Sequence, residues 1–244
     1  MTTSTPSFRR GGGELAIELL HRLDWAALSN AKPKWLIGYS DTTTWMLPMT
    51  LRLGWATAHG SCLMDCVPGQ DDALTRHFFA HLATPRGGHL VQQASTRWQK
   101  QWTDFAVEPG STYRLTEPTR WRELHGADRA RFSGRLVGGC LDTLLHLAGT
   151  AHADVPRFVR DAADDGAIVY LENAEQSPTA AVRALLGLRA AGWFDGVAGV
   201  LIGRCAAPDA GKPDALRYAD ALHAALADLP CPVLVDVDIG HLPP

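Results

Sequence analysis

Three residues of the types that cooperate in nucleophilic catalysis lie at the ends of apolar runs in this sequence: Ser40, Glu172 and His241. A serine hydroxyl is a weak nucleophile until an imidazole accepts its proton, and the imidazole needs a carboxylate to fix its tautomer and stabilise its cation. The three residues also follow one another in the chain order of nucleophile-elbow hydrolases. Their types and order therefore indicate a serine hydrolase.

The candidate nucleophile lies in the stretch LIGYSDTTTW, between an apolar run and a threonine cluster. On a strand-to-helix turn the backbone N–H of Asp41 would lie at a helix N-terminus, where it could stabilise an oxyanion. A second donor could come from the glycine loop at Gly11 or Gly12. The local pattern alone favours an ordinary helix N-cap at Ser40 and a flexible loop at the glycines, and Thr42 replaces the last glycine of the G-x-S-x-G elbow.

Glu172 and His241 likewise allow either a catalytic or a purely structural interpretation. Glu172 alone could be a surface carboxylate at a strand end, and His241 could sit in a polar turn. The elements around them favour the functional interpretation, because short apolar segments alternate with helical patterns. This rhythm predicts an α/β fold with a mainly parallel sheet covered by helices, and such sheets collect their sites at the carboxyl ends of strands.

Strands are expected at 34–39, 55–60, 89–93, 134–139, 167–172, 199–204 and 232–237. Helices are expected at 14–23, 42–54, 71–82, 141–148, 155–163, 179–191 and 216–229. We expect an N-terminal α/β domain at 1–93 with the serine, a Trp-rich connecting loop at 94–131, and a C-terminal α/β domain at 132–244 with Glu172 and His241.

Composition narrows the class of protein. The chain has 244 residues, a net charge of −3 and no basic block, so nucleic acid is not expected as a partner. No apolar run approaches the length that spans a bilayer, and we expect a cytoplasmic protein without membrane contact. The five cysteines are scattered, which favours buried thiols over disulfides, and no zinc-site spacing follows Cys62 and Cys66.

Several motifs taken together resemble one known family. The stretches IGYSDTT, IVYLENAEQSP, GRLVGG, GVLIGR and VDIGHLPP resemble the LD-carboxypeptidase family of serine peptidases, which includes the microcin C immunity proteins. The resemblance implies that Ser40 of G-Y-S-D is the nucleophile, Glu172 of L-E the carboxylate and His241 of G-H-x-P the base. It also implies two domains, with the active site between them.

The resemblance also carries expectations for the oxyanion hole and the activity. It implies an oxyanion hole formed by the backbone of Asp41 and of the glycine loop, Gly11 and Gly12. Family members hydrolyse the amide before a terminal D-alanine in murein tetrapeptides during cell-wall recycling, without a metal or organic cofactor. The immunity branch instead cleaves aminoacyl-nucleotide analogues. A non-catalytic muropeptide-binding remnant is the alternative from another class, and a homodimer is a further expectation.

Two residues are candidates for substrate binding. Arg204 could pair with a substrate carboxylate, although a structural ion pair is equally compatible with the sequence. Trp121, with Trp98 and Trp102, could offer a stacking face for a purine or anchor the connecting loop.

Two departures from the family pattern stand out. Cys140 replaces the Asn that many relatives carry after the paired glycines, which puts any polar contact at that position in doubt. Few residues precede the glycine loop or follow His241, so we expect a protein shortened at both ends.

Overall fold

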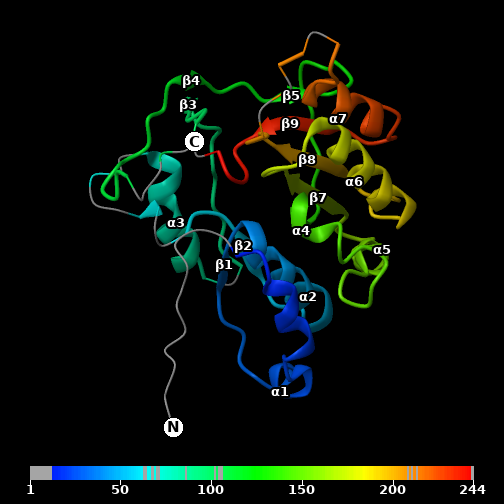
Figure 1. The fold of residues 1–244 in the computed structure, drawn as a ribbon. Coiled ribbons are helices and arrows are strands. Elements are labelled where there is room, and N and C mark those ends of the chain that lie inside the picture. Colours follow the sequence, from blue (N-terminus) through cyan, green and yellow to red (C-terminus); the bar gives the residue numbers. More distant parts are fainter. Residues whose placement is uncertain are drawn as a thin grey trace.

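The computed structural model describes residues 13–62, 65–66, 69, 72–85, 87–101, 103, 107–207, 209, 211–212 and 214–242. Within these ranges the chain forms a small N-terminal lobe and a larger C-terminal sheet covered by helices (Figure 1). The C-terminal segment contacts the N-terminal lobe, because the ring of His241 packs against that of Tyr39. The glycine loop, Gly11 and Gly12, lies outside the described residues, as does Trp102.

The N-terminal lobe is built on two parallel strands. Its elements are η1 (Ala16–His21), α1 (Trp25–Ser29), β1 (Leu36–Gly38), η2 (Ser40–Thr42), α2 (Thr43–Leu53), β2 (Thr57–His59) and α3 (Ala73–Ala83). β1 and β2 pair with Gly38 opposite His59. Because both strands end at the same edge, the residues after Gly38 and the side chain of His59 are brought together there.

The C-terminal part holds a five-stranded sheet in the order β5-β9-β8-β7-β6. Its elements are β5 (Arg122–Glu123), β6 (Arg135–Cys140), α4 (Leu141–Leu144), α5 (Val155–Asp161), β7 (Ala167–Glu172), α6 (Pro178–Ala190), β8 (Gly199–Gly203), α7 (Tyr218–Leu226) and β9 (Val233–Val237). Strands β6 to β9 are parallel and β5 is an antiparallel edge. The predicted α/β fold with a mainly parallel sheet flanked by helices is confirmed.

The core explains why these segments become buried strands. Val137, Val169, Val200 and Val233 come from four neighbouring strands and are 2% exposed or less. Burial of such β-branched side chains on both faces is typical of parallel sheets. Helices α6 and α7 pack side by side over the sheet (Figure 1), while α2 of the N-terminal lobe packs against β6.

The predicted elements differ from the structure in four segments. Residues 89–93 form no strand, because Leu90 and Val91 are 42% and 74% exposed and no sheet covers them. The helices expected at 14–23 and 141–148 are shorter, with η1 a 3-10 helix and α4 ending at Leu144. The 94–131 connection, expected as a loop, contributes β3 (Arg97–Trp98), β4 (Glu117–Pro118) and the edge strand β5.

No helix in the described part of the chain is long and apolar enough to cross a membrane.

Candidate active site

Ser40 lies on a sharp turn between a strand and a helix. Its backbone φ is +62°, in the left-handed region that a residue with a side chain seldom adopts. An N-cap residue instead has extended backbone, and no side chain makes a cap hydrogen bond at the start of η2 or α2. The capping interpretation of Ser40 therefore does not describe this turn, which presents the serine at the end of β1.

Gly38 makes this turn possible. Its φ is +150°, and a Cβ there would lie 2.8 Å from Thr42 Oγ1, so a larger residue would push the strand away from the helix start. The hydroxyls of Thr42 and Thr43 close the turn by donating to the carbonyls of Tyr39 and Ser40. The first glycine of the elbow is thus needed, while Thr42 replaces the last one without loss of the turn.

Asp41 is buried and anchors the segment that follows the glycine loop. Its Oδ2 accepts the N–H of Ala16 at 2.8 Å, and a Cβ on Gly13 would lie 2.6 Å from the same oxygen. The hydrogen bond to Ala16 thus holds this segment beside the serine turn, with residue 13 close to Asp41. The assignment of Gly11 and Gly12 to an oxyanion hole falls on residues outside the described ranges and stays a prediction, as does the role of the Asp41 N–H.

Glu172 and His241 form a hydrogen-bonded pair. His241 Nδ1 lies 2.8 Å from Glu172 Oε2, and the Glu172 side chain is fully buried whereas His241 is 15% exposed. Gly240 (φ +102°) allows this approach, because a Cβ there would lie 2.5 Å from Glu172 Oε2. Glu172 is therefore no surface carboxylate.

The pair alters the acidity of both side chains. Burial alone would raise the pKa of Glu172, but the interactions with His241 and His59 outweigh it and lower the pKa to about 2. Burial alone would lower the pKa of His241, but the hydrogen bond and charge of Glu172 outweigh it and raise the pKa above 6.5. The structure therefore favours an ionised carboxylate beside a basic imidazole.

The serine turn lies next to this pair. The His241 ring packs edge-on against Tyr39, the residue before Ser40, with 4.9 Å between ring centroids. On the other side, Thr43 Oγ1 accepts the N–H of Cys140, whose partner across the sheet is Glu172. Among the described residues no hydrogen bond joins the Ser40 hydroxyl to His241. Catalytic hydrogen bonds are often long without substrate, so the triad stays a prediction.

His59 lines the cavity and lies beside Glu172, although no sequence motif predicted it there. Its side chain is 3% exposed, and its Nε2 lies 3.6 Å from Glu172 Oε1. The segment WATAHG signals only a strand ending at a turn, so nothing local marks the histidine as a partner of Glu172.

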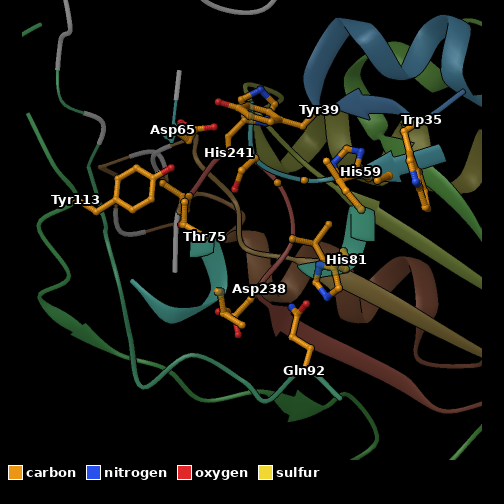
Figure 2. A pocket seen from close by; sticks show the side chains of 18 residues that line it. Trp35, Tyr39, His59, Asp65, Thr75, His81, Gln92, Tyr113, Asp238 and His241 are labelled. Carbon is orange, nitrogen blue, oxygen red and sulfur yellow. The ribbon is translucent and has the colours of Figure 1, made fainter. Parts of the chain in front are cut away.

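A cavity of about 190 Å³ opens beside His241 (Figure 2). The labelled side chains come from both parts of the chain, including Tyr39 and His59 of the N-terminal lobe, Tyr113 of the connection and Asp238 of the C-terminal part. Asp65, also in its wall, accepts the N–H of Cys62, and burial raises the pKa of its carboxyl. The imidazole of His241 therefore lines the wall of this cavity.

Arg204 and Trp121 both contact Asp238. Arg204 is 4% exposed, forms an ion pair with Asp238, and lies 5.0 Å from the centre of the Trp98 ring. Trp121 is 39% exposed and donates its Nε1–H to Asp238 Oδ2 at 3.1 Å. The connection is thereby tied to the segment that carries His241. Substrate binding by Arg204 and Trp121 stays a prediction, and a substrate carboxylate would have to compete with Asp238 for the guanidinium.

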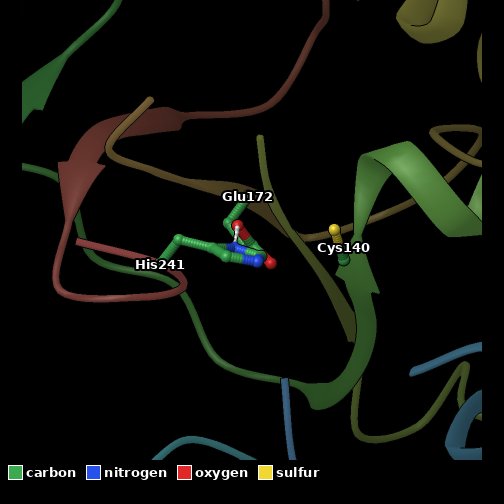
Figure 3. A group of neighbouring side chains, drawn as sticks. All are labelled: Cys140, Glu172 and His241. Atoms are coloured by element: carbon green, nitrogen blue, oxygen red, sulfur yellow. Dashed lines mark hydrogen bonds and ion pairs between the residues drawn. The ribbon is translucent and has the colours of Figure 1, made fainter. Parts of the chain in front are cut away.

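Cys140 completes a second grouping. Its Sγ, one Glu172 oxygen and one His241 nitrogen lie within 4.8 Å of one another, so these side chains could offer ligands to a metal ion (Figure 3). Burial and the charges of Glu172 and Asp142 raise the pKa of the Cys140 thiol, which favours the protonated form. The expectation of a reaction without a metal stays a prediction.

A strained serine turn beside a buried carboxylate–imidazole pair has the composition of a serine peptidase site. The sequence matches the LD-carboxypeptidase N-terminal domain over residues 8–60 and the LD-carboxypeptidase C-terminal domain over residues 133–244. The chain belongs to the LD-carboxypeptidase family.

Individual relatives agree with this membership. A protein of Synechocystis sp. is 31% identical over 235 residues, which span 94% of this chain and 62% of the relative. That protein is named as a carboxypeptidase by inference. The microcin C7 self-immunity protein MccF of Escherichia coli is 25% identical over 240 residues, spanning 96% of this chain and 65% of MccF. The chain therefore spans less than two thirds of the length of these relatives.

Solved structures share the fold. The structure of MccF in complex with glutamyl sulfamoyl guanosine matches with a TM-score of 0.77 at 23% identity, covering 96% of this chain and 67% of MccF. An MccF-like protein from Streptococcus pneumoniae in complex with AMP matches with a TM-score of 0.71 at 26% identity, covering 96% of this chain and 70% of that protein. The α/β fold is thus shared with both.

Proposed function

We propose that this chain is a serine-type carboxypeptidase that hydrolyses the amide bond to a terminal D-amino acid in murein tetrapeptides. As the family resemblance implies, the reaction would belong to cytoplasmic cell-wall recycling. The observation that carries the proposal is the 2.8 Å hydrogen bond between His241 Nδ1 and the buried Glu172, next to the left-handed turn at Ser40.

The pair fixes the roles of the two imidazole nitrogens. With Nδ1–H donated to Glu172, Nε2 is left without a proton and can accept one from the Ser40 hydroxyl. Ser40 Oγ then attacks the amide carbonyl carbon, and His241 holds the transferred proton. Glu172 stays ionised and stabilises the imidazolium, which its low pKa favours.

The remaining steps use the same groups. The carbonyl oxygen becomes an oxyanion, for which the Asp41 N–H and the glycine loop are the proposed donors. His241 gives its proton to the leaving amine as the C–N bond breaks, which leaves an acyl group on Ser40. A water molecule, deprotonated by His241, then hydrolyses this ester and restores the serine.

A second candidate function is supported by the cavity wall. Trp35, Tyr39 and Tyr113 contribute aromatic side chains to it, and aromatic faces bind nucleobases by stacking. Since MccF was solved with an aminoacyl sulfamoyl nucleoside, a serine amidase acting on aminoacyl-nucleotide analogues is the alternative.

The decisive experiment separates chemistry from binding. A fluorophosphonate probe should label Ser40 in the folded protein and should fail in Ser40→Ala and His241→Ala, whereas Ser29→Ala on α1 should label normally. A murein tetrapeptide and an aminoacyl sulfamoyl adenosine are then offered in parallel, with products identified by mass spectrometry. Release of D-alanine supports the carboxypeptidase, and cleavage of the nucleoside supports the alternative. Folded protein that binds muropeptide without labelling would contradict both.

A further inference from the structure

His59 and the serine turn share one two-stranded ladder. β2 ends at His59, and in the pairing of β1 with β2 this residue is opposite Gly38, two positions before Ser40. The N-terminal lobe therefore presents the hydroxyl and this imidazole from the same edge of its two-stranded sheet. Glu172 belongs to the other lobe, at the end of β7.

Within the described part of the chain, His59 and Glu172 both keep buried polar atoms without a hydrogen bond. Glu172 Oε2 binds His241, but Oε1 has no hydrogen bond among the described residues, and neither does either nitrogen of His59. The exposed fractions of the two side chains are 3% for His59 and 0% for Glu172, so bulk water does not satisfy these atoms. An unpaired buried polar atom is costly, which makes each the natural partner of the other.

The geometry is close to a hydrogen bond without reaching one. His59 Nε2 and Glu172 Oε1 are 3.6 Å apart, whereas a formed N–H···O bond has a length of about 2.9 Å. The Tyr170 ring packs edge-on against His59, with centroids 5.5 Å apart, and limits where the imidazole can move. A movement of the lobes of less than about 1 Å would complete the contact.

We propose that His59 is a positioning residue of the hydrolase site, whose Nε2–H holds the second oxygen of Glu172 and so aligns the lobe bearing Ser40 with the lobe bearing His241. The inference rests on the proposed function for its catalytic meaning. Glu172 then binds one imidazole from each side, His59 through Oε1 and His241 through Oε2. Rotation of the carboxylate is prevented, which keeps His241 in the orientation that faces the serine.

Three substitutions of His59, which differ in side-chain length and polarity, test this role. His59→Gln can place an amide N–H near the position of Nε2, whereas His59→Asn is polar but shorter, and His59→Leu is apolar. We expect the maximal rate of fluorophosphonate labelling at Ser40 to fall by about 10-fold to 100-fold in the Asn and Leu variants, with the probe's half-saturating concentration unchanged. His59→Gln should recover most of the rate, and His223→Leu on the exposed face of α7 should match the wild type.

A measurement without turnover separates this inference from the proposed function. Imidazole ¹⁵N signals of the wild type and Glu172→Gln are compared by NMR, and both His59 and His241 should shift when the carboxylate is removed. A folded Glu172→Gln protein in which only His241 shifts would overturn the contact. Equal labelling of the wild type, Gln, Asn and Leu variants would overturn the positioning role. If the wild type never labels, the proposed function and the catalytic part fail, while the NMR result still decides the contact.

Discussion

His241 and Glu172 lie 69 residues apart in the chain and share a hydrogen bond of 2.8 Å at the edge of the parallel sheet. The loop after β9 brings the imidazole back over the end of β7, and Gly240 supplies the space for it. This relationship makes the carboxylate the anchor of the proposed base, and it determines how variants of the site should behave.

Replacement of the carboxylate by an amide should remove most of the activity. In Glu172→Gln the charge that stabilises the imidazolium is lost, and the amide can present its NH₂ group to Nδ1, which favours the wrong tautomer. We expect the rate of Ser40 labelling to fall by about 1000-fold or more. Glu175→Gln, which changes an exposed carboxylate in the turn after β7, should stay within a few-fold of the wild type. A Glu172→Gln protein with normal labelling would remove Glu172 from the mechanism.

As the pH rises through the folded pKa of His241, activity should increase while stability decreases. Because Glu172 raises the pKa of His241 above 6.5, the rate should increase as the pH rises through this raised value and the imidazole becomes neutral. The stability contributed by His241 is fully present below pH 6.5 and is lost as the pH rises through its folded pKa. That contributed by Glu172 is present above pH 4.5 and is lost as the pH falls towards about 2.

Both contributions are therefore complete between pH 4.5 and 6.5, below the pH range of highest activity. Thermal melts and labelling rates recorded over the same buffers test this separation. A labelling rate with its acid limb centred below pH 6.5 would contradict the raised pKa of His241.

Gly240 should tolerate no side chain. In Gly240→Ala the new Cβ would meet Glu172 Oε2 at 2.5 Å, and the φ of +102° is strained for alanine, so the loop must move and carry His241 with it. We expect a loss of about 100-fold in labelling rate and about 1 to 3 kcal/mol in the free energy of unfolding. Gly187→Ala in α6, where nothing lies within 4 Å of the added methyl, should be neutral to stabilising and keep full activity.

Local sequence determined most of the C-terminal sheet. The runs at 167–172 and 199–204 are short, apolar and flanked by glycine, and they form β7 and β8 almost at the predicted bounds. The segment 89–93 has only two apolar residues, Leu90 and Val91, and both are exposed on the surface, where they have no sheet to join. A strand depends on its neighbours, which a short window of sequence does not contain.

The candidate site could be predicted from the sequence only where local signals mark its turns. Gly38 before Ser40 and Gly240 before His241 are local signals of sharp turns, and both turns are present. The contact between His59 and Glu172 joins two lobes, and the ion pair of Arg204 joins two strand ends through Asp238. Such contacts are set by tertiary packing, so neither spacing nor composition could reveal them.

The strain at Ser40 should be measurable. Ser40→Gly relieves the left-handed backbone conformation, whereas Ser40→Ala keeps it, and both remove the hydroxyl. We expect the glycine variant to be more stable than the alanine variant by about 1 kcal/mol in urea unfolding. At Ser29, the last residue of the helix α1, the order should reverse, because glycine is the poorer helix former. Equal stability of the two Ser40 variants would contradict a strained turn.

Asp238 should be more important for the fold than for the chemistry. Its carboxylate binds the buried Arg204, the Ser95 N–H and hydroxyl, and the Trp121 indole, so Asp238→Asn leaves a buried guanidinium without its counter-charge. We expect a loss of about 3 to 5 kcal/mol in the free energy of unfolding, since breaking one side of a buried ion pair leaves the other charge uncompensated. Asp228→Asn, which removes an exposed ion pair with Arg189, should change the melting temperature little. If Asp238→Asn melts like the wild type but binds substrate poorly, the Arg204 pair serves recognition, and its structural role is excluded.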